Sequence, residues 1–323
     1  ALTTRRGARE VATEAAFPIW LPGERGASAQ AADLALAGIE AEIGKRRLDV
    51  AKIVRDAYWE LAEAREKLAL AERRRAIAKA LADDTKRRTA AGQSSQIDQH
   101  LAEAELNDAE AAVEARRSEL REAQIRFEGK TGRKPPGHFK ESAEARRATH
   151  PNVLALSAAV ARAEAERHLV EVVDRDRPEF GLTTQTDRGD RSEDYNTQLG
   201  ARLKIPFAYE AVNAPKRAAA DGAIVAARAE LVAAELALKT EVNGARARLS
   251  GTRQQLAALE KRYTQLSAAV ILIEKAQQAG QTSLSELIRA RVQMFDAANA
   301  RALARIAVDR AQSDINQAQG IEP

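Results

Sequence analysis

The stretch YNTQLGARLKIPFAYEAVNAP, residues 195–215, alternates between two kinds of side chain before it stops at a proline. Successive residues of a β-strand point to opposite faces, so this segment predicts a strand with one apolar and one polar face. The apolar set comprises Tyr195, Thr197, Leu199, Ala201, Leu203, Ile205 and Phe207, and the polar set comprises Asn196, Gln198, Gly200, Arg202 and Lys204.

The rest of the chain has the composition of long helices. Among 323 residues, aromatics make up 4% and charged residues 30%, and alanine, leucine, glutamate and arginine dominate. This composition favours coiled coil over a compact core. The 51 lysines and arginines and the 47 aspartates and glutamates are interleaved. Interleaved charge indicates solvated helix faces and argues against a nucleic-acid-binding surface.

Residues that carry catalysis or bind metals are scarce. The chain has no cysteine and one methionine, and its four histidines are scattered. We therefore expect no disulfide, no metal site and no cofactor. Neither a nucleophile–base pair, nor a phosphate-binding loop, nor a carboxylate pair stands out, so we expect no enzymatic activity. No apolar run reaches about 18 residues, so no membrane-spanning helix is expected.

The sequence repeats at an offset of 188 residues. AAFPIWLP (15–22) resembles LKIPFAYE (203–210), and AAGQSSQID (90–98) resembles QAGQTSLSE (278–286), both at an offset of 188. Agreement of separate segments at one offset predicts an internal tandem duplication.

Each repeat is expected to contain an amphipathic strand, a very long helix and a shorter return helix. For the first repeat, residues 1–188, the prediction is a strand over 7–20, a long helix over 26–91, a return helix over 95–128, an irregular segment over 129–150, a helix over 152–174 and a strand over 178–188. For the second repeat, residues 189–323, it is a strand over 194–207, a long helix over 214–279 and a return helix over 283–318. We expect both repeats to intertwine as a single domain in space.

The long helices carry apolar residues at steps of three, four and seven, which predicts a coiled-coil seam along which the helices of each hairpin pair. The glycine of each AGQ turn suits a left-handed helix end, and the serine three residues later suits an N-cap. The first seam comprises Leu36, Ile39, Ile43, Val50, Ile53, Ala57, Leu61, Ala64, Leu68 and Ala71.

An amphipathic strand of about 9–11 residues with aromatic residues near its ends is typical of a transmembrane β-strand. Residues 195–207 fit this pattern, and Trp20 and Tyr209 lie where an interfacial aromatic belt would lie. Because lipid does not tolerate an open sheet edge, several chains would have to associate. The predicted lipid-facing side chains are those of Tyr195, Leu199, Leu203, Ile205 and Phe207.

The order strand, proline, long helix, AGQ turn and return helix, present in tandem, resembles the TolC-type outer-membrane efflux channels. The FPIWLPGERG and LKIPF segments resemble the strand-to-helix junctions of members that serve heavy-metal and multidrug pumps. This resemblance covers essentially the whole chain. It implies a mainly helical fold with a small β part. In a homotrimer, the helical hairpins would form a periplasmic α-barrel and the strands a transmembrane β-barrel.

The function that the resemblance implies is a passive exit duct of a tripartite efflux or type I secretion system. The duct would lie in the outer membrane of a Gram-negative bacterium, with its helices in the periplasm. Its partners would be a periplasmic adaptor (membrane fusion protein), an inner-membrane RND-type or ABC pump, and outer-membrane lipid. Selection of the exported substrate would rest with the pump. A helix and a strand would then be missing before Ala1, so we expect an N-terminally truncated chain.

Two other classes of protein remain open. A soluble coiled-coil scaffold or periplasmic adaptor hairpin would have alternating segments that are solvated on both faces, against which Leu199 and Leu203 argue. A nucleic-acid binder would need clustered basic charge.

The resemblance also implies roles for residues at the ends of the long hairpins, where the family narrows its tunnel. Asp98 matches a gate aspartate, and Glu286 matches an acid that rings the pore. Gln277 and Thr282 replace the gate tyrosine and arginine, and Arg289 replaces a second acid. Arg289 is expected to neutralise part of the charge of Glu286. The structural alternative is that both acids only stabilise the first turn of a helix.

The hairpin turns themselves would dock the adaptor. A glycine there both makes the turn and allows close approach of a partner backbone. The docking residues are predicted to be Gly92, Ser95, Gly280 and Ser283.

Overall fold

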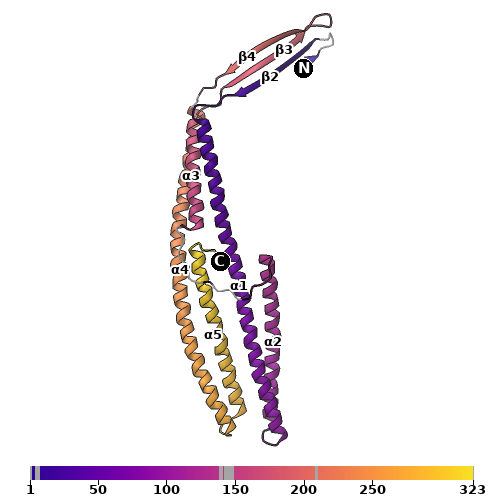
Figure 1. The fold of residues 1–323 in the computed structure, drawn as a ribbon, viewed down its shortest axis with the longest axis vertical. Coiled ribbons are helices and arrows are strands. Elements are labelled where there is room, and N and C mark those ends of the chain that lie inside the picture. Colours follow the sequence, from indigo (N-terminus) through magenta and orange to yellow (C-terminus); the bar gives the residue numbers. More distant parts are fainter. Residues whose placement is uncertain (1, 4–7, 138–140, 142–148, 208–209, 323) are drawn as a thin grey trace. The chain divides into compact units, whose positions relative to one another are not determined.

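The computed structural model describes residues 2–3, 8–137, 141, 149–207 and 210–322. It is mainly helical with one small antiparallel sheet (Figure 1). In chain order the elements are β1 (Leu2–Thr3), β2 (Arg9–Pro18), α1 (Glu24–Ala90), α2 (Gln96–Thr131), α3 (Pro151–Val172), β3 (Glu179–Arg188), β4 (Asn196–Lys204), α4 (Glu210–Gln278) and α5 (Leu284–Ala318).

The chain forms two compact units, and each is described separately. The first unit comprises residues 1–44 and 151–235, and the second comprises 45–150 and 236–323. Each unit takes residues from both sides of position 188, so the units do not follow the predicted repeats. The duplication remains a prediction.

The observed elements differ from the expected ones by a few residues at most ends, and two differences have a clear cause. The short strand β1 pairs with β2 and was not predicted, because two residues carry no readable alternation. Helix α4 begins at Glu210 rather than at residue 214 and contains Pro215. A proline near a helix start fixes a helical φ and removes only one ladder hydrogen bond, which the long helix tolerates.

The sheet of the first unit has the order β1-β2-β3-β4 with antiparallel neighbours. Directly paired residues point to the same face, so the register decides which side chains share a face. Val11, Thr186 and Thr197 are in register on one face, and Glu14, Thr183 and Gly200 on the other. The alternation predicted for residues 195–207 therefore extends across the three longer strands.

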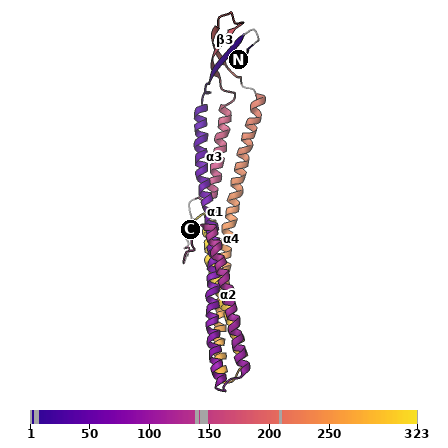
Figure 2. The same ribbon diagram turned by 90° about the vertical axis from the view of Figure 1, so that its right-hand side faces the viewer.

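The helical part of the first unit is held by ion pairs between its helices. Arg167 of α3 donates to Asp221 of α4 at 2.6 Å, and Arg228 of α4 donates to Glu164 of α3 at 2.6 Å. Figure 2 shows the segments of α1, α3 and α4 that leave the sheet side by side. These residues belong to the interleaved charges of the sequence. In the structure they form ion pairs between α3 and α4.

The second unit packs its helices through small side chains. One buried cluster joins α1 to α2 and contains Ala57, Tyr58, Trp59, Leu61, Ala64, Ala123 and Phe127. A second joins all four helices and contains Ala82, Ala102, Val270, Leu284 and Leu287. A third joins α4 to α5 and contains Ala245, Leu249, Ala311, Ile315 and Ala318.

The predicted seam is wrong for the N-terminal part of α1. Ala57, Leu61 and Ala64 are buried, as expected, but the five seam residues before them are exposed. The periodicity identifies an apolar stripe and cannot tell whether its partner is in the same chain. The exposed members are Leu36, Ile39, Ile43, Val50 and Ile53, whose exposed fractions lie between 47% and 60%.

Candidate functional site

The turn between α1 and α2 is built from a left-handed glycine and a serine cap. Gly92 has a φ of 70°, and its amide donates to the Thr89 carbonyl at 2.9 Å. The Gln93 amide donates to the Arg88 carbonyl at 2.8 Å, which closes the helix end. Ser95 is the N-cap of α2 and accepts from the Asp98 amide at 3.0 Å. The predicted glycine stop and serine cap are confirmed here.

The turn between α4 and α5 repeats this geometry. Gly280 has a φ of 73°, its amide donates to the Gln277 carbonyl at 3.0 Å, and Gln281 donates to the Ala276 carbonyl at 2.8 Å. Ser283 is the N-cap of α5. Both turns therefore present equivalent backbone groups, which follows from the AGQ sequence that they share.

Asp98 is engaged within its own turn. Its Oδ2 accepts the Ser94 hydroxyl at 3.1 Å, the Ser95 hydroxyl at 2.9 Å and the Ser95 amide at 3.3 Å. Together with the Ser95 cap this forms a capping box. Among the described residues, every hydrogen bond of this carboxylate is local, so in the single chain Asp98 acts as a helix-capping residue.

Glu286 is exposed at the start of α5. Its amide donates to Ser283 Oγ at 3.3 Å, and its carboxylate accepts the Thr282 hydroxyl. Among the described residues no ion pair involves Arg289, which is exposed too, so the local neutralisation of Glu286 expected from it stays a prediction. Thr282, which stands where the resemblance places a gate arginine, thus hydrogen-bonds to Glu286.

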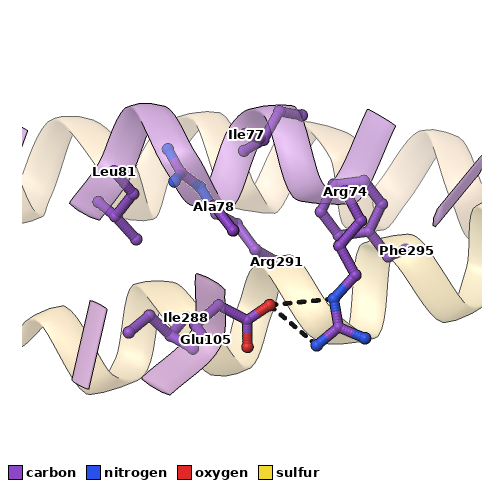
Figure 3. Close-up of a pocket in the computed structure, with 8 residues that line it drawn as sticks. All are labelled: Arg74, Ile77, Ala78, Leu81, Glu105, Ile288, Arg291 and Phe295. Atoms are coloured by element: carbon purple, nitrogen blue, oxygen red, sulfur yellow. Dashed lines mark hydrogen bonds and ion pairs between the residues drawn. The ribbon is translucent and has the colours of Figure 1, made fainter. Parts of the chain in front are cut away.

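Two ion pairs each join the helices of one hairpin. Glu105 Oε1 accepts Arg74 Nε at 3.0 Å and Arg74 Nη2 at 2.9 Å, which joins α1 to α2 (Figure 3). Arg291 of α5 donates to Glu274 of α4 at 2.7 Å. The pocket between these pairs encloses about 10 Å³, enough for at most one water molecule. This pocket is therefore a packing gap and not a small-molecule site.

The sheet combines an exposed apolar face with a polar face that carries paired charges. The described residues of the apolar face include Val11, Phe17, Phe180, Leu182, Leu199 and Leu203, all of them exposed. Tyr195, Ile205 and Phe207, which flank β4, are exposed too. On the polar face, Gln185 donates to Glu10 at 2.9 Å, and Lys204 lies 3.4 Å from Glu179. Arg202 of β4 donates to Glu14 of β2, across β3.

Gly181 makes the contact between Glu14 and Arg202 possible. It lies in register with Ala16 on one side and Arg202 on the other. A Cβ at this position would lie 3.0 Å from Glu14 Oε1, closer than such contacts normally come. The missing side chain thus leaves room for two charged side chains to meet over the middle strand.

The junction between β2 and α1 holds the predicted aromatic Trp20. The Arg177 guanidinium lies 3.9 Å from the centre of the Trp20 ring, and Arg177 Nε donates to Glu24 Oε1 at 2.7 Å. Burial raises the pKa of Glu24, but hydrogen bonds from the Leu21 amide and Arg177 outweigh burial, so the pKa is lowered. Tyr209, the other aromatic predicted for this level, lies outside the described residues.

Sequence reasoning missed the buried polar cluster around Arg55 in the second unit. Arg55 is 4% exposed and pairs with Glu141, 86 residues later. In the sequence, both residues lie among many interleaved charges, and nothing marks them as a pair. Their contact is seen only in the structure.

The described residues contain no group of three or more histidine, aspartate or glutamate side chains placed to hold a metal ion. Among these residues, no helix is both long and apolar enough to cross a membrane.

Comparison with known proteins relates this geometry to one family. Residues 4–133 match the family model described as outer membrane efflux protein. No curated protein sequence matches the chain. Among solved structures, the CmeC outer membrane channel of Campylobacter jejuni has a TM-score of 0.70 at 12% identity, covering 97% of this chain and 77% of that chain.

Two further channel structures are similar over nearly the whole chain. The open state of the MtrE outer membrane channel of Neisseria gonorrhoeae has a TM-score of 0.71 at 16% identity, covering 99% of this chain and 81% of that chain. The outer membrane protein VceC of Vibrio cholerae has a TM-score of 0.70 at 15% identity, covering 98% of this chain and 87% of that chain. The predicted resemblance to outer-membrane efflux channels is thus confirmed in fold, and over residues 4–133 in sequence.

Proposed function

We propose that this chain, with the fold of outer-membrane channels and an outer membrane efflux protein match over residues 4–133, is a protomer of an outer-membrane exit duct. The duct passively conducts exported substrates across the periplasm and the outer membrane. Its strands span the membrane, and its helical hairpins extend into the periplasm of a Gram-negative bacterium.

The observation that carries this proposal is the two-faced sheet. Leu199 is 85% exposed, and Leu203 is 58% exposed on the same face. The opposite face carries the Glu14–Arg202 and Glu179–Lys204 contacts. Transmembrane β-strands alternate between apolar residues toward lipid and polar residues toward a lumen. A soluble scaffold would leave this apolar face in water, so the sheet favours the channel over the scaffold.

Exposed apolar stripes on the helices support trimer formation. Leu36, Ile39 and Ile43 form an exposed apolar stripe on α1, and Val225 and Val232 are exposed seven residues apart on α4. Apolar residues at such spacing pack against another helix. The described strands also end in β4, which has a neighbour on one side only. Further copies of the chain would cover the stripes and close the sheet into a trimeric β-barrel.

The hairpin turns are proposed to meet the rest of the export system. Gly92, Ser95, Gly280 and Ser283 would form the surface that docks a periplasmic adaptor, which joins the duct to an RND-type or ABC pump. Both turn glycines have open space around them, so a partner backbone can approach. In a trimer, the three Glu286 side chains would form a ring around the pore.

The proposal is tested on the protein expressed with an export signal. We expect it to require detergent for extraction from outer membranes, to have the mass of a trimer by light scattering, and to conduct ions in planar bilayers. A water-soluble monomer with intact helicity would contradict the channel.

A further inference from the structure

Two arginines lie on the apolar face of the sheet, at the end that we call the loop end. Here β2 begins at Arg9, β3 ends at Arg188 and β4 begins at Asn196, whereas α1, α3 and α4 connect to the other ends of these strands. Arg9 and Arg188 are direct partners in the register, on the face that carries Val11 and Leu182. Among the described residues of β2, β3 and β4, no other charged side chain lies on this face.

The two arginines form a row with an aromatic residue. Arg188 stacks over the ring of Tyr195, 4.7 Å from its centre. Arg9 is exposed, and among the described residues its side chain has no hydrogen bond or ion pair. The next acids along the strands, Glu10 and Asp187, are in register on the opposite face. We call Arg9, Arg188 and Tyr195 the arginine row. Because like charges in direct register repel each other, this row is unfavourable unless an anion joins it.

The acids of the β3–β4 loop hold the loop together. Asp190 lies near enough to attract Arg188, but its Oδ1 also accepts the Ser192 amide at 2.6 Å and the Ser192 hydroxyl at 2.5 Å. Glu193 Oε2 accepts the Gly189 amide at 2.8 Å. Hydrogen bonds within the loop thus occupy both carboxylates, which leaves the arginine row to an anion from outside the chain.

The arginine row lies at the height of a lipid headgroup, a step that rests on the proposed duct, in which the apolar face is toward lipid. Arg9 and Phe17 are eight residues apart on β2. This separation is about 27 Å along a strand, and about 21 Å across a membrane at a tilt of about 40°. The apolar band of such barrels is about 25 Å tall. With Phe17 at one boundary of the band, the arginine row therefore lies at the other, on the outer side.

The apolar face also becomes more polar toward the arginine row. Next to the row, Thr186 and Thr197 are in register, and their hydroxyl oxygens lie 3.2 Å apart. At the other end of the strands, Phe180 and Leu203 are in register. Such a gradient matches a lipid molecule, whose chains meet the apolar part of the face and whose headgroup meets the polar part.

At the opposite end of the sheet, the corresponding arginine is neutralised. Arg177 lies over the Trp20 ring as Arg188 lies over that of Tyr195. There, however, Arg177 donates to Glu24 at 2.7 Å. Both ends have an arginine on an aromatic ring, but only the loop end adds a second arginine in register with the first. The loop end is therefore the one that fits an anionic headgroup.

We propose that the arginine row binds the phosphate groups of a membrane lipid in the outer leaflet. A planar guanidinium group binds phosphate through parallel hydrogen bonds, and Arg9 and Arg188 present such donors to one headgroup. The bound phosphate also removes the repulsion between the two arginines. The lipid is a structural ligand at the outer rim of the sheet, distinct from the exported substrate.

The test compares lipid A, a phosphorylated glycolipid of outer leaflets, with its dephosphorylated form, because the two differ only in phosphate. The protein, expressed with an export signal, is purified in a neutral detergent, and native mass spectrometry counts the bound lipid over a titration. We expect the parent to bind lipid A at least about tenfold more tightly than the dephosphorylated lipid, because the latter cannot form the charge-assisted hydrogen bonds.

Substitutions locate the preference. The double variant Arg9→Gln/Arg188→Gln should bind both lipids equally. Arg202→Gln, the matched control, removes the same charge from the polar face and should keep the preference. Arg9→Gln alone leaves the stacking of Arg188 on Tyr195 in place and should reduce the preference, so it decides the matter if the double variant does not fold.

Three results would overturn the proposal: a parent without preference for the phosphorylated lipid, arginine-row variants that keep the preference, or a control that loses it equally. Inorganic phosphate at the concentration of the lipid should not compete, because it has no chains to hold it against the apolar face. If it abolishes the preference, the row binds free phosphate and not lipid. A detergent-dependent trimer without the preference rejects the lipid site alone, whereas a water-soluble monomer rejects the duct.

Discussion

Glu14 and Arg202 lie 188 residues apart, at equivalent positions of the two predicted repeats, and their side chains bond to each other across β3. The residue on β2 is acidic and the one on β4 is basic. Their contact ties two strands that are not neighbours in the sheet. It therefore adds a link between the outer two of the three longer strands in their observed register.

We expect Gly181→Val to weaken this contact, because the new side chain would occupy the space of the Glu14 carboxylate. Partly exposed ion pairs contribute at most about 1 kcal/mol, so the loss in stability should be of that order. Thermal unfolding of the purified protein measures it. Thr184→Val, on the opposite face of β3, is the control, and equal losses in both variants would contradict the role of Gly181.

Leu203 and Arg202 are neighbours on β4 but lie on opposite faces of the sheet. Substitutions at the two positions should therefore differ in their effect on stability in the membrane. Leu203→Arg places a charge on the proposed lipid face and should cost about 2–4 kcal/mol near the middle of the membrane. Arg202→Gln, on the polar face, should be mild. Folding into lipid vesicles against increasing urea measures both, and similar costs would show that the faces are assigned wrongly.

Replacing the exposed acid at the second turn should change ion selectivity. Among the described residues Glu286 forms no ion pair, so three copies would attract cations into a narrow pore, where charges act more strongly than in bulk water. We expect a cation-preferring channel whose preference falls in Glu286→Gln, as measured from reversal potentials across a salt gradient. Glu274→Gln is the control, because Arg291 holds that carboxylate. An anion-preferring parent, or an unchanged mutant, would exclude Glu286 from the pore.

His150 should make stability depend on pH. Burial lowers the pKa of His150 from its ordinary value of 6.5, against smaller opposing contributions from Glu241 and the Gln317 backbone. The folded state therefore binds fewer protons than the unfolded state, and stability should be lost as the pH falls below 6.5. In thermal unfolding between about pH 8 and pH 5, the parent should lose more stability than His150→Gln. If the parent and His150→Gln lost the same stability over this pH range, His150 would not be the cause of the pH dependence.

Local features of the fold could be predicted from the sequence. A glycine followed three residues later by serine determines each turn through backbone conformation and capping, and these depend only on neighbours in the chain. The alternation in β4 likewise determines its two faces. The prediction that the seam of α1 pairs within the chain was wrong before Ala57, because an apolar stripe does not show which helix it packs against.

Long-range features could not be predicted. Arg55 meets Glu141 and Gln317 over separations of 86 and 262 residues, with no motif at any of the three positions. The partner of Glu286 could not be predicted either, because Arg289, three residues later, suggested an ion pair. In the folded chain the Thr282 hydroxyl is its partner, and only the side-chain geometry decides between them.

The outer edge of β4 has no neighbouring strand among those described, so its backbone amides and carbonyls lack ladder partners there. An uncovered edge is a template for any compatible strand, including a wrong one. If further copies of the chain complete the sheet, as proposed above, then completion of the sheet and association of the chains are a single reaction, and the stability of the assembly depends on the concentration of protomers. Unassembled chains would then expose this edge, so folding and assembly would have to be closely coupled.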